Sequence, residues 1–131
     1  MPVPPSPLIL YVALGSAMGG VARFLIGGAL QRADSTFPSG TLTVNIAGSF
    51  ILGAVARYAA MSPTFSPELR LLIGAGFCGG LTTFSTFSVE AIELMQGGAL
   101  ARAGLYVAVS VLTGLGAALV GMAVVRTILE R

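Results

Sequence analysis

Four long apolar stretches dominate the chain, and each is long enough to cross a lipid bilayer as a helix. A spanning helix needs about 20 mostly apolar residues. The stretches cover residues 8–30, 42–60, 69–95 and 105–129, and we predict one spanning helix in each. All seven prolines lie before or between them, where they remove no hydrogen bond from a helix interior.

The composition indicates lipid rather than water as the surrounding solvent. Hydrophobic residues make up 55% of the 131 residues and charged residues only 9%, whereas a soluble domain carries about 25% charged residues. Soluble monomers rarely expose the apolar surface that such a chain would present. We therefore predict an all-α membrane protein with a single domain over residues 1–131, in the plasma or inner membrane.

Several classes of function are excluded by the residue inventory. The chain has no histidine and one cysteine, Cys78, so one chain can build neither a Cys/His metal site nor a Ser-His-Asp or Cys-His catalytic group. We expect Cys78 to be a buried, inert thiol and the protein not to be an enzyme. The arginines are scattered singly, without the basic stripe of a nucleic-acid-binding protein.

The arginines also bear on orientation in the membrane. Four lie on the side shared by the termini and the second linker, and two on the other side: Arg57, Arg70, Arg126 and Arg131 against Arg32 and Arg102. Positive residues favour the cytoplasmic side, so the termini are predicted to be cytoplasmic. So weak a bias is what a chain inserting in both orientations would show.

The third stretch contains the most informative segment. Gly79 and Gly80 are followed by five hydroxyl residues within seven positions, over residues 82–88. Paired glycines weaken a helix, and non-helical backbone at membrane depth must be buried in protein or line a wet cavity. We predict a helix break over residues 79–83. Its freed carbonyls could hold a hard cation such as Na⁺; alternatively, the segment is a packing seam with hydroxyls bonded back to i−4 carbonyls.

Phe84 and Phe87 follow the predicted break and share one helix face. An aromatic edge carries positive electrostatic potential. Two edges beside hydroxyl donors make a weakly attractive path for a small anion, and rapid conduction needs such a balance between binding and release. The alternative is that both rings serve simple packing.

Two further spans carry polar stripes on one helix face. They comprise Thr41, Asn45 and Ser49 in the second span, and Tyr106, Ser110 and Thr113 in the fourth. An amide in a membrane helix faces the protein interior, because lipid offers it no partner. Asn45 and the fourth-span hydroxyls could therefore line a polar path or make structural hydrogen bonds.

The remaining residues of interest within the spans are two charged residues, which could belong to a site, and several small residues, which could pack helices together. Arg23 could attract anions at a vestibule or pair with a carboxylate or helix end, and Glu90 lies one turn past Thr86. The pairs Gly15/Gly19, Gly76/Gly80 and Ala117/Gly121 have the small-xxx-small spacing that allows helix backbones to approach closely.

Gly79-Gly80-Leu81-Thr82-Thr83-Phe84-Ser85-Thr86-Phe87-Ser88-Val89-Glu90 resembles the corresponding string of the Fluc, or CrcB, family of fluoride channels. The patterns GG-x-x-RF at residues 19–24 and FPSGTL-x-VN at residues 37–45 agree in order, and the resemblance covers roughly residues 8–129. It implies an antiparallel, dual-topology homodimer enclosing two fluoride pores. It also implies fluoride export for fluoride resistance, and a structural Na⁺ at the dimer centre.

The resemblance implies roles for particular residues. The backbone carbonyls of Gly79 and Thr82 of each subunit would bind Na⁺. Phe84 and Phe87 would line the pores, with Asn45, Ser110 and, more loosely matched, Thr113. Further positions that the resemblance or the polar stripes bring to the pore are Arg23, Glu90 and Tyr106.

Two alternatives to a channel remain, and the first has a similar size and span number. A small dual-topology multidrug/H⁺ exporter would need a titratable group at membrane depth, and only Glu90, near the end of its span, could serve. A non-transporting membrane assembly subunit would leave the five clustered hydroxyls unexplained. Fast, proton-independent fluoride flux would separate a channel from the exporter.

Overall fold

Four helical spans make up most of the computed structural model, which describes residues 6–31 and 35–131. Helix α1 covers Ser6–Leu30, α2 covers Ser39–Met61, and α6 covers Leu100–Leu129. The third span consists of α3 (Pro67–Arg70), the π-helical η1 (Leu71–Cys78), α4 (Gly79–Leu81) and α5 (Phe84–Gln96). The four spans are long and apolar enough to cross a membrane, which confirms the predicted helices. Helix α6 begins before residue 105, because it continues past Arg102 beyond the apolar stretch.

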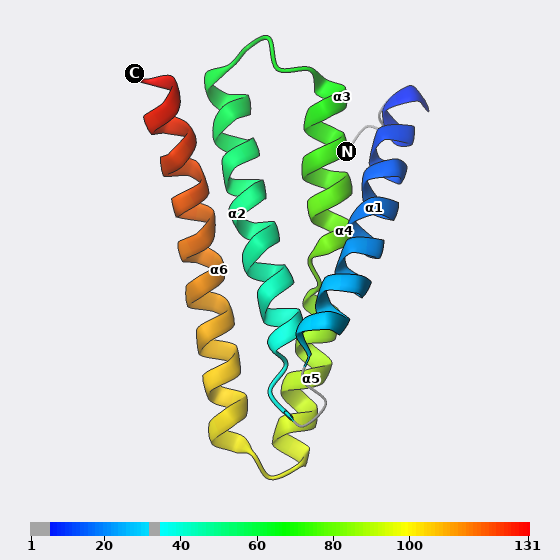
Figure 1. The fold of residues 1–131 in the computed structure, drawn as a ribbon, viewed down its shortest axis with the longest axis vertical. Coiled ribbons are helices and arrows are strands. Elements are labelled where there is room, and N and C mark those ends of the chain that lie inside the picture. The colour runs from blue at the N-terminus through cyan, green and yellow to red at the C-terminus, as the bar shows by residue number, and fades with distance from the viewer. Residues whose placement is uncertain (1–5, 32–34) are drawn as a thin grey trace.

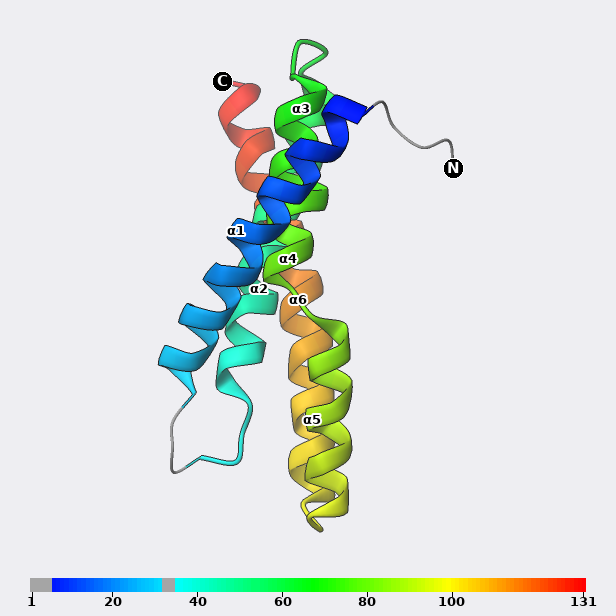
Figure 2. The ribbon, with the colours of Figure 1, turned by 90° about the vertical axis from the view of Figure 1, so that its right-hand side faces the viewer.

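The spans alternate in direction, as the short connections between them require. The beginning of α1, the α2–α3 connection and the end of α6 lie at one end of the molecule (Figure 1). Helix α6 runs beside α2, while α1 crosses the first half of the third span and then diverges from it (Figures 1 and 2). Arg32, which the predicted charge bias includes, lies outside the described residues.

Close helix contacts within one chain involve the predicted small residues. A side chain on Gly15 or Gly19 would overlap backbone atoms of η1, and one on Gly80 would overlap the Ser16 carbonyl. A side chain on Gly121 would likewise overlap the Phe50 carbonyl of α2. Small residues thus allow α1 to approach the third span and α6 to approach α2.

The third span is interrupted, as predicted, but over fewer residues than expected. Thr82 (φ −86°, ψ 156°) and Thr83 (φ −150°, ψ 116°) are extended, while Gly79 retains helical angles (φ −63°, ψ −38°). The predicted start of the break at residue 79 is therefore corrected to Thr82. The glycines stay helical because their contribution is close packing: Gly80 has no room for a side chain beside α1.

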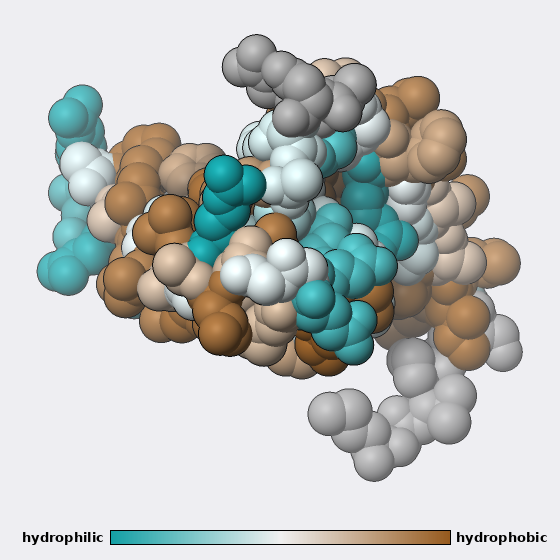
Figure 3. Space-filling model, turned by 90° about the horizontal axis from the view of Figure 1, so that it is seen from below, coloured by the Kyte–Doolittle hydropathy of each residue, from teal (hydrophilic) through white to brown (hydrophobic). Residues whose placement is uncertain are grey.

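The sides of the molecule are strongly apolar. Leu112 on α6 is 70% exposed and Phe24 on α1 is 80% exposed. Figure 3 shows the end of the molecule that carries the α5–α6 turn. Hydrophilic residues gather at this end, and hydrophobic residues lie around them. Large exposed apolar side chains on every span indicate contact with lipid or with another membrane protein. The chain is thus a multi-pass membrane protein.

Candidate functional site

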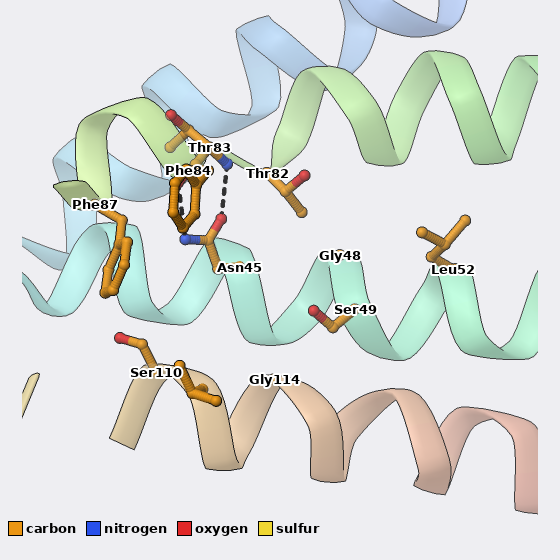
Figure 4. A pocket seen from close by; sticks show the side chains of 11 residues that line it. Asn45, Gly48, Ser49, Leu52, Thr82, Thr83, Phe84, Phe87, Ser110 and Gly114 are labelled. Carbon is orange, nitrogen blue, oxygen red and sulfur yellow. Dashed lines mark hydrogen bonds between the residues drawn. The ribbon is translucent and has the colours of Figure 1, made fainter. Parts of the chain in front are cut away.

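The side chain of Asn45 holds the break in the third span. Its Oδ1 accepts a hydrogen bond from the Thr83 N–H (2.8 Å), and its Nδ2 donates to the Thr83 carbonyl (3.1 Å). Figure 4 shows both bonds joining α2 to the extended residues. Thr83 is only 8% exposed, so its backbone groups need protein partners. One of the two Asn45 N–H donors is used here.

Thr83 also begins α5. Its hydroxyl accepts from the Thr86 N–H (3.2 Å), which makes it the N-cap, and donates to the Thr86 hydroxyl (3.0 Å). A Ser or Thr cap satisfies one of the amides that a helix start leaves without a partner. The break is therefore an ordered structure in which α4 ends and α5 begins in a new direction.

Because of these bonds, two backbone amides donate to side chains instead of to the carbonyls that they would reach in a continuous helix. In an uninterrupted helix the Thr83 and Thr86 amides would donate to the carbonyls of Gly79 and Thr82; here they donate to Asn45 and to the Thr83 hydroxyl. The two carbonyls are oxygen donors of the kind that hard cations prefer. No cluster of three His, Cys, Asp or Glu side chains suited to a metal occurs among residues 6–31 and 35–131.

A cavity of about 270 Å³ opens beside the break, between α2, α5 and α6. Figure 4 shows the residues that surround it. No charged side chain is among them: the lining consists of Asn45, Gly48, Ser49, Leu52, Thr82, Thr83, Phe84, Phe87, Ser110, Val111 and Gly114. The cavity combines two aromatic rings with hydroxyl and amide groups, and no fixed charge on its walls could trap an anion.

One hydroxyl group and one pair of aromatic rings distinguish the cavity. The Ser110 hydroxyl is buried and has no hydrogen-bond partner among the described residues. The rings of Phe84 and Phe87 lie 5.6 Å apart between centroids, and Phe84 is 79% exposed in a single chain. A buried hydroxyl without a partner is unusual enough to require an explanation, and a ligand that accepts a hydrogen bond would supply one.

Glu90 lies near the end of the molecule that carries the α5–α6 turn and accepts two hydrogen bonds. Thr41 donates to its Oε1 (2.8 Å), and the Tyr106 hydroxyl donates to its Oε2 (2.7 Å). Tyr106 is fully buried, and its ring contacts the rings of Phe87 (5.2 Å between centroids) and Phe37 (5.5 Å). A line of aromatic rings thus connects the cavity to the Glu90 carboxylate.

A second groove lies on the other side of the break, beside α1. Arg23 and Glu90 both contribute to its lining, with hydroxyls from Thr41, Thr83 and Thr86. Arg23 is partly buried and lines this groove together with polar residues of α2 and α5. Thr83 lines both the groove and the cavity.

The structure brings some of the predicted site residues together and separates others. Asn45, Phe84, Phe87 and Ser110 share the cavity, whereas Glu90 and Tyr106 form the hydrogen-bonded group with Thr41. Arg23 belongs to the other groove. Thr113 is not among the residues that line the cavity, and its hydroxyl donates to the Val109 carbonyl in its own helix (2.6 Å).

Thr83 is the residue that the sequence prediction missed. A signal for it was available, because a Ser, Thr, Asp or Asn directly before a helix is a typical cap. Because five hydroxyl residues lie within seven positions, the capping residue could not be chosen among them without knowing where the helix restarts.

Comparisons with known proteins agree on one family. The family model described as "CrcB-like protein, Camphor Resistance (CrcB)" matches residues 10–122. The protein of Hahella chejuensis named Fluoride-specific ion channel FluC is 48% identical over 124 residues, which cover 94% of this chain and 98% of that protein. Proteins of the same name are 44% identical in Rhizobium johnstonii, over 91% of this chain and 96% of theirs, and 50% identical in Pseudomonas aeruginosa, over 70% and 72%.

Proposed function

Because this chain belongs to the CrcB family, a family of fluoride channels rather than enzymes, we propose that it conducts fluoride passively out of the cytoplasm. The proposed path runs along Phe84, Phe87 and Ser110, in each of two pores of an antiparallel homodimer. The observation that carries the path is the buried Ser110 hydroxyl, whose donor has no partner among the described residues, in a cavity lined by two phenylalanine rings.

The chemistry of the cavity suits a small, hard anion. Hydroxyl and amide donors replace the water around an anion, and phenylalanine edges add weak positive potential. The second Asn45 N–H donor supports the same role, because only one is used on Thr83. Fluoride is compact and accepts hydrogen bonds strongly, so these few donors suit it better than they suit a larger halide.

The surface of a single chain supports assembly with a second copy. Phe84, Ser85 and Thr86 are exposed on one chain beside the break, and lipid offers hydroxyls no partner. A two-fold related copy would cover this surface and complete the wall of the cavity. The weak arginine bias supports an antiparallel arrangement, since neither orientation is strongly preferred.

The residues at the break fit a structural Na⁺ between the two copies. The carbonyls of Gly79 and Thr82 would hold the ion, since the amides that would bond to them in a continuous helix donate elsewhere. Gly79 is exposed, and apart from its own helical turn no atom of the chain lies within 4 Å of where a Cβ would be, so its surroundings are open to a partner. Bound there, Na⁺ would supply positive charge that holds the carbonyls of both subunits in place.

Arg23 and the Glu90 group belong to the ends of the proposed path. Arg23 would raise the local concentration of anions in the groove beside α1, because a charge at a low-dielectric wall is poorly screened. Glu90 would orient Thr41 and the Tyr106 hydroxyl, its two hydrogen-bond donors.

Flux through purified protein in liposomes tests the proposed function. With K⁺ and valinomycin to balance charge, we expect fluoride efflux that is fast, independent of a proton gradient, and far above chloride efflux. Liposomes without protein are the control. Equal fluoride and chloride rates would contradict a fluoride-selective pore, and a requirement for a proton gradient would instead favour an exporter.

The structural cation leads to a separate prediction. Adding Na⁺ to the detergent-solubilised dimer should stabilise it by about 2.7 kcal/mol at 100 times the dissociation constant, because Na⁺ binds only the folded form. Thermal unfolding in Na⁺, compared with N-methylglucamine at equal ionic strength, measures this effect. In a Gly79→Val variant, whose Cβ would meet no neighbouring segment of the same chain within 4 Å, the Na⁺ response should be lost. A wild-type midpoint that ignores Na⁺ after removal of trace Na⁺ would argue against the site.

A further inference from the structure

The side chain of Gln31 makes three hydrogen bonds to the connection between α1 and α2 and to the beginning of α2. Its Nε2 donates to two carbonyls of the connection, those of Ser35 (3.1 Å) and Phe37 (3.2 Å). Its Oε1 accepts from the Gly40 N–H (3.4 Å), an amide in the first turn of α2. Gln31 therefore uses both ends of its amide to join the end of α1, the connection and the beginning of α2.

The surrounding contacts keep this corner in one geometry. Ser39 Oγ donates to the Leu30 carbonyl at the end of α1 (2.8 Å). A side chain on Gly40 would overlap the Gly27 carbonyl, so the two helices meet in direct backbone contact. The Leu30 carbonyl and the Gly40 N–H belong to helix ends, where backbone groups lack intrahelical partners. The side chains of Ser39 and Gln31 supply these partners.

The residue held by Gln31 touches the Glu90 group. The Phe37 ring meets the Tyr106 ring edge to face, at 5.5 Å between centroids and 79° between planes. Phe37 also covers the buried cluster that contains Tyr106, Ala91, Leu94 and Ala103. The orientation of the Tyr106 ring determines whether its hydroxyl reaches Glu90, 2.7 Å away. Gln31 also borders both grooves that Glu90 lines.

We propose that Gln31 is a positioning residue of the fluoride path: it fixes Phe37 against Tyr106 and thereby holds the Tyr106 hydroxyl on Glu90. The inference rests on the proposed function, since it assigns Gln31 a role in conduction. Gln31 lies at the surface and lines no part of the cavity between α2, α5 and α6, so we assign its effect on that cavity to the contact of Phe37 with Tyr106.

The test compares Gln31→Met with Gln96→Met, a change of the chain's other glutamine, which is exposed at the end of α5. Fluoride efflux from liposomes should fall about fivefold in Gln31→Met, a factor that corresponds to about 1 kcal/mol, and stay at the wild-type rate in Gln96→Met. Gln31→Glu keeps the acceptor for Gly40 and loses both donors to the carbonyls, so it should be impaired as well. It serves as the second variant if Gln31→Met does not fold.

Two measurements separate positioning from general destabilisation. Phe37→Leu should lower efflux by a similar factor, and the double variant Gln31→Met/Phe37→Leu should be no slower than either single one, because both act on one contact. With Tyr11 and Tyr58 replaced by Phe, 3-fluorotyrosine at Tyr106 should change its ¹⁹F resonance in Gln31→Met and not in Gln96→Met.

Each outcome decides the proposal. Wild-type efflux in Gln31→Met, multiplying effects in the double variant, or an unchanged Tyr106 resonance would overturn the role of Gln31 while the channel function stands. Absence of fluoride efflux from the wild-type protein would overturn the proposed function and this inference with it.

Discussion

Replacing Asn45 by leucine is expected to lower fluoride efflux roughly 100-fold or more. Leucine has a similar volume but leaves the Thr83 N–H and carbonyl without the partners that they have at 2.8 and 3.1 Å. An unsatisfied buried group costs about 1–3 kcal/mol, and about 2.7 kcal/mol corresponds to a factor of 100 in rate. The same change removes the N–H donor that we assign to the anion.

Asn45→Asp separates the two roles of the amide. The carboxylate still accepts from the Thr83 N–H, but it cannot donate to the Thr83 carbonyl and adds negative charge where an anion should pass. We expect a loss of flux as large as that in Asn45→Leu, with the Asp variant dimer retaining its elution volume in detergent.

The control for Asn45 lies on the same helix. Thr43 is exposed, and its hydroxyl donates to the Ser39 carbonyl, so Thr43→Val should conduct at the wild-type rate. Efflux measured with a fluoride electrode, together with the elution profile of each variant, provides the comparison. If Asn45→Leu conducts as fast as Thr43→Val, neither the hydrogen bonds to Thr83 nor the free donor serves conduction.

The spans and the break could be predicted because the membrane restricts which residues can lie at each depth. In a chain with so few charged residues, an apolar stretch of about 20 residues is best explained as a spanning helix. Hydroxyls after paired glycines likewise indicate irregular backbone that protein must cover. The π-helical geometry of η1 carries no such signal, since an apolar run such as Leu71–Cys78 is equally compatible with an α-helix.

The hydrogen-bond partners of the polar residues could not be predicted. A polar group in lipid needs a partner within the protein, but the sequence does not indicate which residue supplies it. Asn45 and Thr83 are separated by 38 positions, and Glu90 is 49 positions from Thr41. Both pairs depend on how α2 packs against the third span. The hydrogen-bond partner of Thr113 is local instead: a threonine hydroxyl can rotate to bond to the i−4 carbonyl, and Thr113 bonds to Val109 in this way.

Replacing Phe84 or Phe87 by isoleucine is expected to lower fluoride efflux roughly tenfold each while the dimer still forms. Pairs of aromatic rings contribute about 0.5–1.5 kcal/mol beyond area burial; we take the same magnitude for an edge that contacts an anion, and about 1.4 kcal/mol is a factor of ten in rate. Isoleucine retains the apolar surface and removes the positive edge. Phe84→Ile disturbs fewer ring contacts within the chain, because Phe84 contacts the Phe87 ring, whereas Phe87 also contacts the Tyr106 ring.

The distinction between packing and conduction depends on comparing flux with stability in the same variants. Phe50→Ile on α2 is the control, since Phe50 lies outside the cavity and the groove beside α1. If the rings only pack, Phe87→Ile should lower the thermal midpoint and Phe84→Ile should change neither midpoint nor flux. If they line the path, Phe84→Ile should slow fluoride at an unchanged midpoint. Replacing Phe84 by pentafluorophenylalanine, which keeps the ring but makes its edge negative, should slow fluoride further, because the anion is then repelled where it was attracted.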